Sequence, residues 1–508
     1  MMPSWRKLLL GAVAGVVAGC GGESVSPAPR DPVKLSTVNQ ALLATCPYSS
    51  PAINMDKELV VRNLSVVNDA CRTQYNGTNC ANTGSRGKWS FGYLMSQIAG
   101  GKNEAGTSEF VLNWLATWQT DQIVNGHVVA ARAGVSASGA PLGMNKFVNT
   151  WRTKSNCQAT GPCTLDFNQA PFRLLAIINR IDLSGNAYGS ASPGELRFVF
   201  GFVDLTKLGD ASSNNGAMKG TVIFEYKLTQ HSDTFWWAEM WHDLAYYEFS
   251  EAYNSRLEQL TNLVTIYNPA MIPGGSAISQ IRTNEIEFDT AALSSRVWEL
   301  REQTRDCSQG TTCRMKPDTV KLTPDSRYNK GGEEQENPAY KGSALDSYLL
   351  NNAPLIDAED LSTLPPHMIG GASRSKSALG QQLVWDLSTE SQGSYEPNGG
   401  SFRTSTRHVF ALQTCGGCHY AETGTSNFHV APRGINQMAA LSGFLAPSGS
   451  EALLPNTGDW RQPYHYTSPT DPVDFETRQY NDLWRRKCEM QRLLNFDQEP
   501  LFKPSGAH

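Results

Sequence analysis

Hydrophobic residues recur along the chain with two different periods, and each period predicts a different kind of element. Runs rich in β-branched and aromatic residues, separated by loops of Gly, Asn and Ser, predict strands over 172–183, 195–205 and 221–228. Shorter runs favour further strands over 297–301 and 319–322. Apolar residues three and four positions apart predict helices over 90–99, 108–124, 236–263, 405–412 and 476–494. This order of elements predicts an α+β fold with an antiparallel sheet and helices in a large N-terminal domain, followed by a small, mostly helical C-terminal domain.

The composition limits the class of protein. The chain has 508 residues, of which 40% are hydrophobic, so it can bury a full core and is not wholly disordered. It has no long apolar run after residue 20, which excludes a protein with many membrane-spanning helices. A formal net charge of −5 offers no basic surface, so we expect no nucleic-acid partner.

The first residues have the pattern of an export signal. A basic segment, Trp5-Arg6-Lys7, precedes a short apolar run that ends in Val17-Ala18-Gly19-Cys20. This ending resembles the lipobox of bacterial lipoproteins, which implies cleavage before Cys20 and lipidation of its thiol. Residues 1–19 are then a signal peptide and residues 20–45 a flexible tether. Gly21 favours the outer membrane by analogy with enterobacterial sorting, although an ordinary signal with an incidental cysteine is the alternative.

Ten cysteines remain after Cys20, and an even number in an exported protein favours disulfide bonds. Short separations make three pairs candidates: Cys71 with Cys80, Cys157 with Cys163, and Cys307 with Cys313. Cys46 and Cys488 then remain at opposite ends of the sequence and can pair with each other. A zinc site at these pairs is disfavoured, because oxidised thiols do not bind metal and no histidine stands at finger-like spacing.

The remaining two cysteines belong to Thr414-Cys415-Gly416-Gly417-Cys418-His419. The pattern Cys-x-x-Cys-His resembles the haem attachment site of c-type cytochromes, in which two thiols add to the haem vinyl groups and the adjacent imidazole binds iron. The resemblance implies one covalent haem c held by Cys415 and Cys418, with His419 as axial iron ligand. Two other interpretations stay open: a plain or redox-active disulfide, and a metal site of both cysteines with His419 and His429.

The flanking helices at 405–412 and 476–494 extend the resemblance, because class I cytochromes c pack two such helices together. It implies a cytochrome c-like haem domain over residues 402–508, a linker at 386–401, and an α+β domain of unknown role at 46–385. Met438 or His429 is the candidate sixth ligand, and His465 is a further one. Several segments, among them 172–183, are similar to a group of uncharacterised exported bacterial proteins, which implies no activity.

Charged residues inside the predicted strands allow two interpretations. They form cross-strand ion pairs on one solvated face, or they line a polar cleft in which Arg180 and Arg197 hold a carboxylate or a haem propionate. Residues 282–285 can join that cleft. Likewise, the tryptophans at 236, 237 and 241 pack in the core or form an aromatic binding wall, and their helical spacing favours the core.

These observations favour an extracytoplasmic, lipid-anchored mono-haem c protein that acts in electron transfer or as an oxidoreductase. We expect a redox partner protein and attachment to the outer membrane through Cys20, on the periplasmic or the surface side. The alternative is a non-enzymatic surface lipoprotein, a disulfide-stabilised binding or structural module. The sequence does not decide whether the protein is an enzyme.

Overall fold

The computed structural model describes residues 46–81, 83–184, 194–228, 234–268, 275–290, 296–308, 313–329, 343–357, 360–376, 383–385, 401–446, 472 and 480–496. All of these residues belong to one compact unit. The expected signal peptide, the tether with Cys20, residues 386–400 of the expected linker, and His465 lie outside the described residues.

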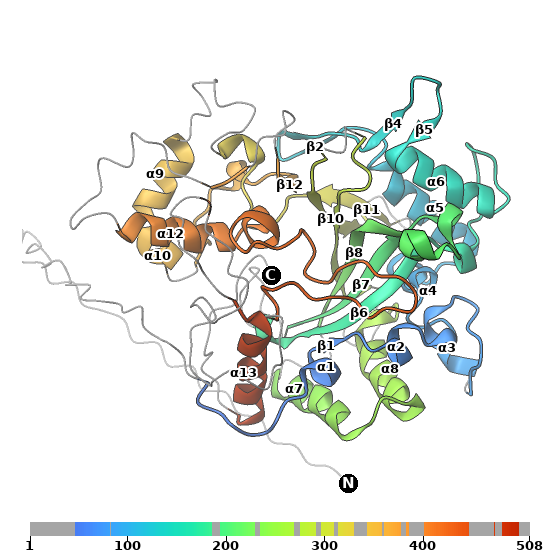
Figure 1. Cartoon of the computed structure of the whole chain (residues 1–508), viewed down its shortest axis with the longest axis horizontal. Helices are drawn as coiled ribbons and strands as arrows, with labels where there is room; N and C mark the ends of the chain where they lie inside the picture. Colours follow the sequence, from blue (N-terminus) through green and yellow to red (C-terminus); the bar gives the residue numbers. More distant parts are fainter. Residues whose placement is uncertain are drawn as a thin grey trace, which may run out of the picture. The chain divides into compact units, whose positions relative to one another are not determined.

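The fold is α+β, as predicted, and its centre is an antiparallel sheet of eight described strands (Figure 1). The strand order is β1-β6-β7-β8-β9-β10-β11, and β12 also pairs with β10. The bounds are β1 Val60–Val61, β6 Phe172–Arg180, β7 Glu195–Val203, β8 Ala217–Lys227, β9 Ile278–Glu285, β10 Glu299–Asp306, β11 Arg314–Asp318 and β12 Ala372–Arg374. Two short hairpins pair β2 Gln122–Val124 with β3 His127–Val129, and β4 Ala133–Val135 with β5 Pro141–Leu142.

Helices surround this sheet (Figure 1). Their bounds are α1 Met55–Glu58, α2 Leu64–Val67, α3 Ala70–Thr73, α4 Phe91–Ile98, α5 Glu104–Ala116, α6 Gly143–Lys154, α7 Thr234–His242, α8 Glu251–Thr265, α9 Ser343–Asn351, α10 Ala353–Asp357, α12 Ser401–Leu412 and α13 Asp482–Leu494. α12 packs against α9 and α10, whereas α13 packs against α7. None of the helices in the described ranges has the length and apolar character needed to cross a membrane.

Some predicted elements are wrong in their bounds. The helix expected over 236–263 is two helices, because the Ser250 side chain accepts a hydrogen bond from the Tyr253 amide and starts α8 anew. The helix expected over 108–124 ends at Ala116, and β2 follows it. β11 ends at Asp318, so residues 319–322 form no strand. The core interpretation of the tryptophans agrees with the structure, in which Trp237 and Trp241 are fully buried.

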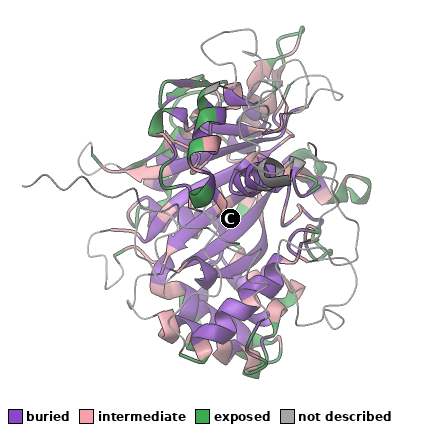
Figure 2. Ribbon diagram, turned by 90° about the vertical axis from the view of Figure 1, so that its left-hand side faces the viewer, coloured by how far each residue is buried: buried purple, intermediate pink, exposed green. Residues whose placement is uncertain are grey.

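The two faces of the sheet differ because side chains alternate along a strand. One face carries aromatic residues, and the ring of Phe91 from α4 lies 6.0 Å from Phe200 and 5.7 Å from Phe224. The other face carries charged residues such as Arg197 and Glu225, which lie opposite each other on β7 and β8. These residues are buried, and Figure 2 shows most of the central strands as buried. The expectation of a solvated face is therefore wrong.

Four disulfide bonds join cysteines of the described residues, and they are the pairs that the sequence favours. Three are local: Cys71–Cys80, Cys157–Cys163 and Cys307–Cys313. The fourth joins Cys46 to Cys488 across a sequence separation of 442 residues, with their Cα atoms 5.5 Å apart. This last bond attaches α13 to the first described residue of the chain.

Candidate functional site

The Cys-x-x-Cys-His segment follows α12 directly and forms an irregular turn. The Thr414 hydroxyl donates to the Ala411 carbonyl at 2.7 Å and accepts from the Trp385 indole at 2.7 Å. A π-helical turn, η10 (Gly417–Ala421), comes next. A Cβ atom at Gly417 would collide with the Ala411 carbonyl, so this position of the motif requires glycine. π-Helical turns occur often at functional sites because they redirect side chains.

The two motif cysteines are buried, and neither takes part in the disulfide bonds of the described residues. The amide of Cys415 donates to the Thr323 hydroxyl at 3.0 Å, and Cys418 Sγ lies 3.2 Å from His429 Nε2. Burial raises the pKa of both thiols, so they are protonated at neutral pH. Among the described residues, no three His, Cys, Asp or Glu side chains are placed to hold a metal ion.

His419 is buried, and two contacts fix the orientation of its ring. Its Nδ1 lies 3.1 Å from the Asn427 carbonyl, and its ring stacks on Trp298 with ring centroids 5.3 Å apart. Burial lowers the pKa of His419 to about 4, so the imidazole is neutral. A neutral imidazole beside a carbonyl oxygen carries its hydrogen on Nδ1, and Nε2 therefore keeps a lone pair for a ligand.

His429 faces His419, and their ring centroids are 4.2 Å apart. A small hairpin positions His429: Val430 pairs with Leu441, and the Ser442 hydroxyl lies 2.9 Å from His429 Nδ1. Met438 lies on the same hairpin but is 47% exposed and does not line the pocket described below. Of the two sequence candidates for a sixth ligand that the structure describes, only His429 thus lies beside His419.

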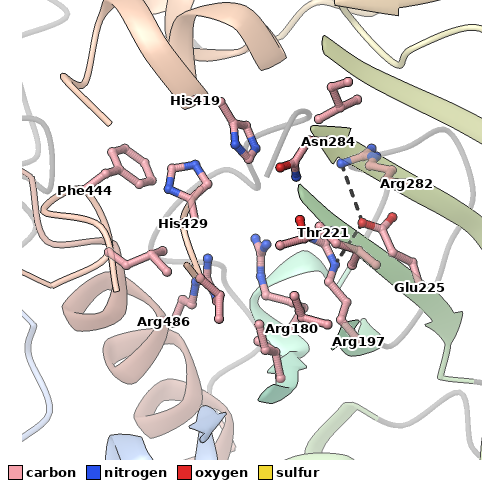
Figure 3. A pocket seen from close by; sticks show the side chains of 16 residues that line it. Arg180, Arg197, Thr221, Glu225, Arg282, Asn284, His419, His429, Phe444 and Arg486 are labelled. Carbon is pink, nitrogen blue, oxygen red and sulfur yellow. Dashed lines mark ion pairs between the residues drawn. The ribbon is translucent and has the colours of Figure 1, made fainter. Parts of the chain in front are cut away.

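The two histidines line a pocket between the motif segment and the charged face of the sheet (Figure 3). Its enclosed volume is about 60 Å³, and the wider space around it, which includes open solvent, is about 650 Å³. Its apolar lining comprises Ile178, Val199, Ile223, Leu300, Val430, Phe444 and Leu445. Neither cysteine lines the cavity. Cys418 contacts His429, which does line it.

Four arginines line the side of the pocket formed by the sheet and α13: Arg180, Arg197, Arg282 and Arg486. A buried carboxylate pairs with each of them. The closest nitrogen–oxygen distances are 2.9 Å for Arg180–Asp182, 2.8 Å for Arg197–Glu195, 3.0 Å for Arg282–Glu302 and 2.6 Å for Arg486–Asp482. Glu225 lies between Arg197 and Arg282, at 3.4 and 3.7 Å. The lining thus presents four guanidinium groups and one carboxylate to a ligand.

A second ionic cluster lies behind the motif and holds it in place. Arg407 of α12 makes a bidentate pair with Glu422 at 2.6 and 3.1 Å, and His408 Nδ1 lies 2.8 Å from the same carboxylate. The Tyr480 hydroxyl lies 3.2 Å from His408 Nε2. All four side chains are buried. The cluster fixes α12 against the end of η10. No sequence motif marks it, because Tyr480 lies 72 residues after His408.

The structure brings together most of the residues that the sequence singled out. Cys418, His419 and His429 meet at one place, and Arg180, Arg197 and Arg282 form the charged cleft of the second interpretation. The pattern of the helix expected over 476–494 predicts that residues 485–487 mostly face solvent; this is wrong, because Arg485 and Arg486 are buried and Arg486 lines the pocket. Asp482, four residues earlier, was the available signal, since this spacing puts the two side chains on one helix face.

No family model, curated protein or solved structure matches this chain. The chemistry of the pocket must therefore be argued from its own residues.

Proposed function

We propose that the chain carries one covalent haem c, attached through Cys415 and Cys418, with His419 as axial iron ligand. The observation that carries this proposal is that His419 of the Cys-x-x-Cys-His motif lines a pocket whose other side carries arginines. The two cysteines of the motif are not disulfide-bonded, His419 Nε2 has a lone pair, and guanidinium groups line the opposite side of the pocket. A haem needs these three features for its vinyl groups, its iron and its propionates.

When bound, the haem supplies one-electron redox chemistry, and the residues of the chain set the conditions for it. The Asn427 carbonyl and the Trp298 ring fix the orientation of His419. The apolar lining supplies contacts for the macrocycle and excludes water. The arginines would donate hydrogen bonds to the propionates.

We further propose that His429 is the second axial ligand, which favours electron transfer over small-molecule chemistry. His429 lines the pocket, and an imidazole on each side of the iron leaves no open position for a substrate. The ring centroids of His419 and His429 are 4.2 Å apart in this structure, so the two side chains would have to separate for both to hold the iron. The proposed site differs from a class I cytochrome c, since the sheet supplies one of its walls.

The test is production of the full chain in cells that have a cytochrome c maturation system. A haem stain after denaturing electrophoresis and a reduced-minus-oxidised spectrum report covalent haem. We expect one haem per chain and a spectrum of six-coordinate, low-spin iron. Protein that is folded and exported but contains no covalent haem would refute the proposal and favour the disulfide-stabilised lipoprotein.

The lipobox-like Cys20 supports a second part of the proposal, namely attachment to the outer membrane outside the cytoplasm. Four disulfides are consistent with an oxidising compartment. The variant Cys20→Ala is expected to abolish incorporation of labelled fatty acid and to release the protein from the membrane fraction. Labelling equal to that of the wild type would contradict the anchor and leave the haem proposal untouched.

A further inference from the structure

Arg180 and Arg486 come from distant parts of the chain and meet at the pocket. Arg180 ends β6, and Arg486 lies on the first half of α13. Both side chains are buried, and Figure 3 shows both guanidinium groups on the side of the pocket away from His419. They are thus placed to contact one group of a ligand that also reaches the histidines.

Each of these two arginines binds a carboxylate of the protein through one edge of its guanidinium group, formed by Nε and Nη2. Arg180 donates to Asp182 through Nε and Nη2, at 2.9 and 3.0 Å. Arg486 contacts Asp482 through the same two nitrogens, at 2.7 and 2.6 Å. Among the described residues, Nη1 of neither arginine makes a hydrogen bond, so each retains donors for a further acceptor.

The surrounding charges favour an additional anion. Asp182 and Asp482 are also bound by Arg485, at 2.7 Å each, so three guanidinium groups of the described residues share these two carboxylates. Burial and the nearby charge of Arg180 lower the pKa of Arg486 to about 10, despite Asp482. A ligand with a negative charge would offset this unfavourable burial.

We propose that Arg180 and Arg486 bind a carboxylate group of a ligand in the pocket. The planar guanidinium matches a carboxylate in geometry, and the apolar lining accommodates the hydrocarbon part of such a ligand. Two sources supply this chemistry: a propionate of the attached haem, which rests on the proposed function, or a free small carboxylate that enters the pocket.

The experiment compares the full chain produced with and without cytochrome c maturation, in both cases with butyrate as the probe in isothermal titration calorimetry. Butyramide, which has nearly the same shape and no charge, is the matched control ligand. We expect the haem-free chain to bind butyrate more tightly than butyramide, and Arg486→Gln to weaken butyrate binding by about tenfold or more. Arg486→Lys should recover part of the loss, because it keeps the charge without the planar fork.

The two sources give different results with the haem-loaded chain. If a propionate occupies the arginines, this chain no longer binds butyrate, and Arg486→Gln lowers its midpoint potential. If the natural ligand is a free carboxylate, both forms of the chain bind butyrate. Failure to attach haem refutes the proposed function but not the carboxylate site, because the haem-free chain tests that site by itself.

A second arginine on the same helix provides a control for effects of the substitution on folding. Arg492 is buried and pairs with Glu489 at 2.8 Å, but it does not line the pocket. Arg492→Gln is expected to bind butyrate like the wild type, and circular dichroism should show that both glutamine variants are folded. The proposal is overturned if the haem-free wild type binds butyrate no better than butyramide, or if folded Arg486→Gln binds butyrate as tightly as the wild type.

Discussion

The two walls of the pocket differ in charge: the motif wall is neutral, and the sheet wall carries arginines and carboxylates. On the motif wall, burial lowers the pKa of His419, and it raises the pKa of Cys418, which lies next to His429 outside the cavity. On the sheet wall, each arginine has a carboxylate at 3.0 Å or less. Charged groups are therefore buried there as ion pairs, in which each charge offsets part of the desolvation of the other. The neutral wall suits covalent attachment and ligation, and the charged wall suits recognition of anions.

The largest effect is expected when the two cysteines of the motif are replaced. The double variant Cys415→Ser, Cys418→Ser is expected to lose covalent haem completely, as measured by haem staining, because no thiol remains to add to the vinyl groups. The fold should persist, since these cysteines form no crosslink. As a matched control, Cys157→Ser with Cys163→Ser removes a local disulfide far along the chain and should keep its haem. Haem retention in the first variant would contradict the assignment of the motif.

The second largest effect is expected when a carboxylate that pairs with the arginines of the charged wall is removed. Asp182 compensates Arg180 and Arg485, so Asp182→Asn leaves buried guanidinium groups with one carboxylate fewer. We expect the free energy of unfolding to fall by about 3–5 kcal/mol in urea denaturation. Glu109→Gln, at an exposed position of α5, serves as the control and should leave stability unchanged. A change below 1 kcal/mol (roughly that of a surface ion pair) in Asp182→Asn would mean that this network is not essential.

A smaller effect is expected in the absorption spectrum, and it distinguishes His429 from Met438, which lie on the same hairpin. In the haem-loaded chain, His429→Ala is expected to convert low-spin iron to high-spin iron while the haem stays attached, because the second axial ligand is lost. Met438→Ala should leave the absorption spectrum unchanged, since Met438 lies outside the pocket. The opposite result, a spectral change with Met438→Ala alone, would assign the ligand to Met438.

The smallest expected effect is the acid dependence of the charged wall. Burial raises the pKa of Asp182, but Arg180, Arg485 and Arg486 outweigh it and hold the pKa below its usual range. Similarly, Arg301 and Arg132 lower the pKa of Glu299 to about 2. Carboxylates with depressed pKa values stabilise the fold above their unfolded pKa of ~4, and this stability is lost as the pH falls through the folded values.

Urea denaturation at pH 6, 4 and 3 measures this dependence. The free energy of unfolding of the wild type is expected to fall between pH 4 and 3. Asp182→Asn should fall less steeply, because one of the responsible carboxylates is missing. Equal slopes for the two proteins would show that Asp182 does not contribute to the acid sensitivity.

The sequence was sufficient to predict elements and chemistry that depend on neighbouring residues. The runs at 172–183, 195–205 and 221–228 predicted β6, β7 and β8, because alternation and β-branched content are local properties. Cys415, Cys418 and His419 were identifiable because their spacing is set by the geometry of one turn. The local disulfides followed from short separations in the same way.

The tertiary structure decided which surfaces are covered. The sequence allowed the charged face of the sheet to be either solvated or a cleft, since alternation assigns residues to a face but not to solvent. Residues of the segment 419–445 and of α13 cover that face, which makes it the wall of a pocket. The same packing placed Arg486 inside rather than outside and chose His429 over Met438 as the neighbour of His419, because these outcomes depend on contacts between segments that are distant along the chain.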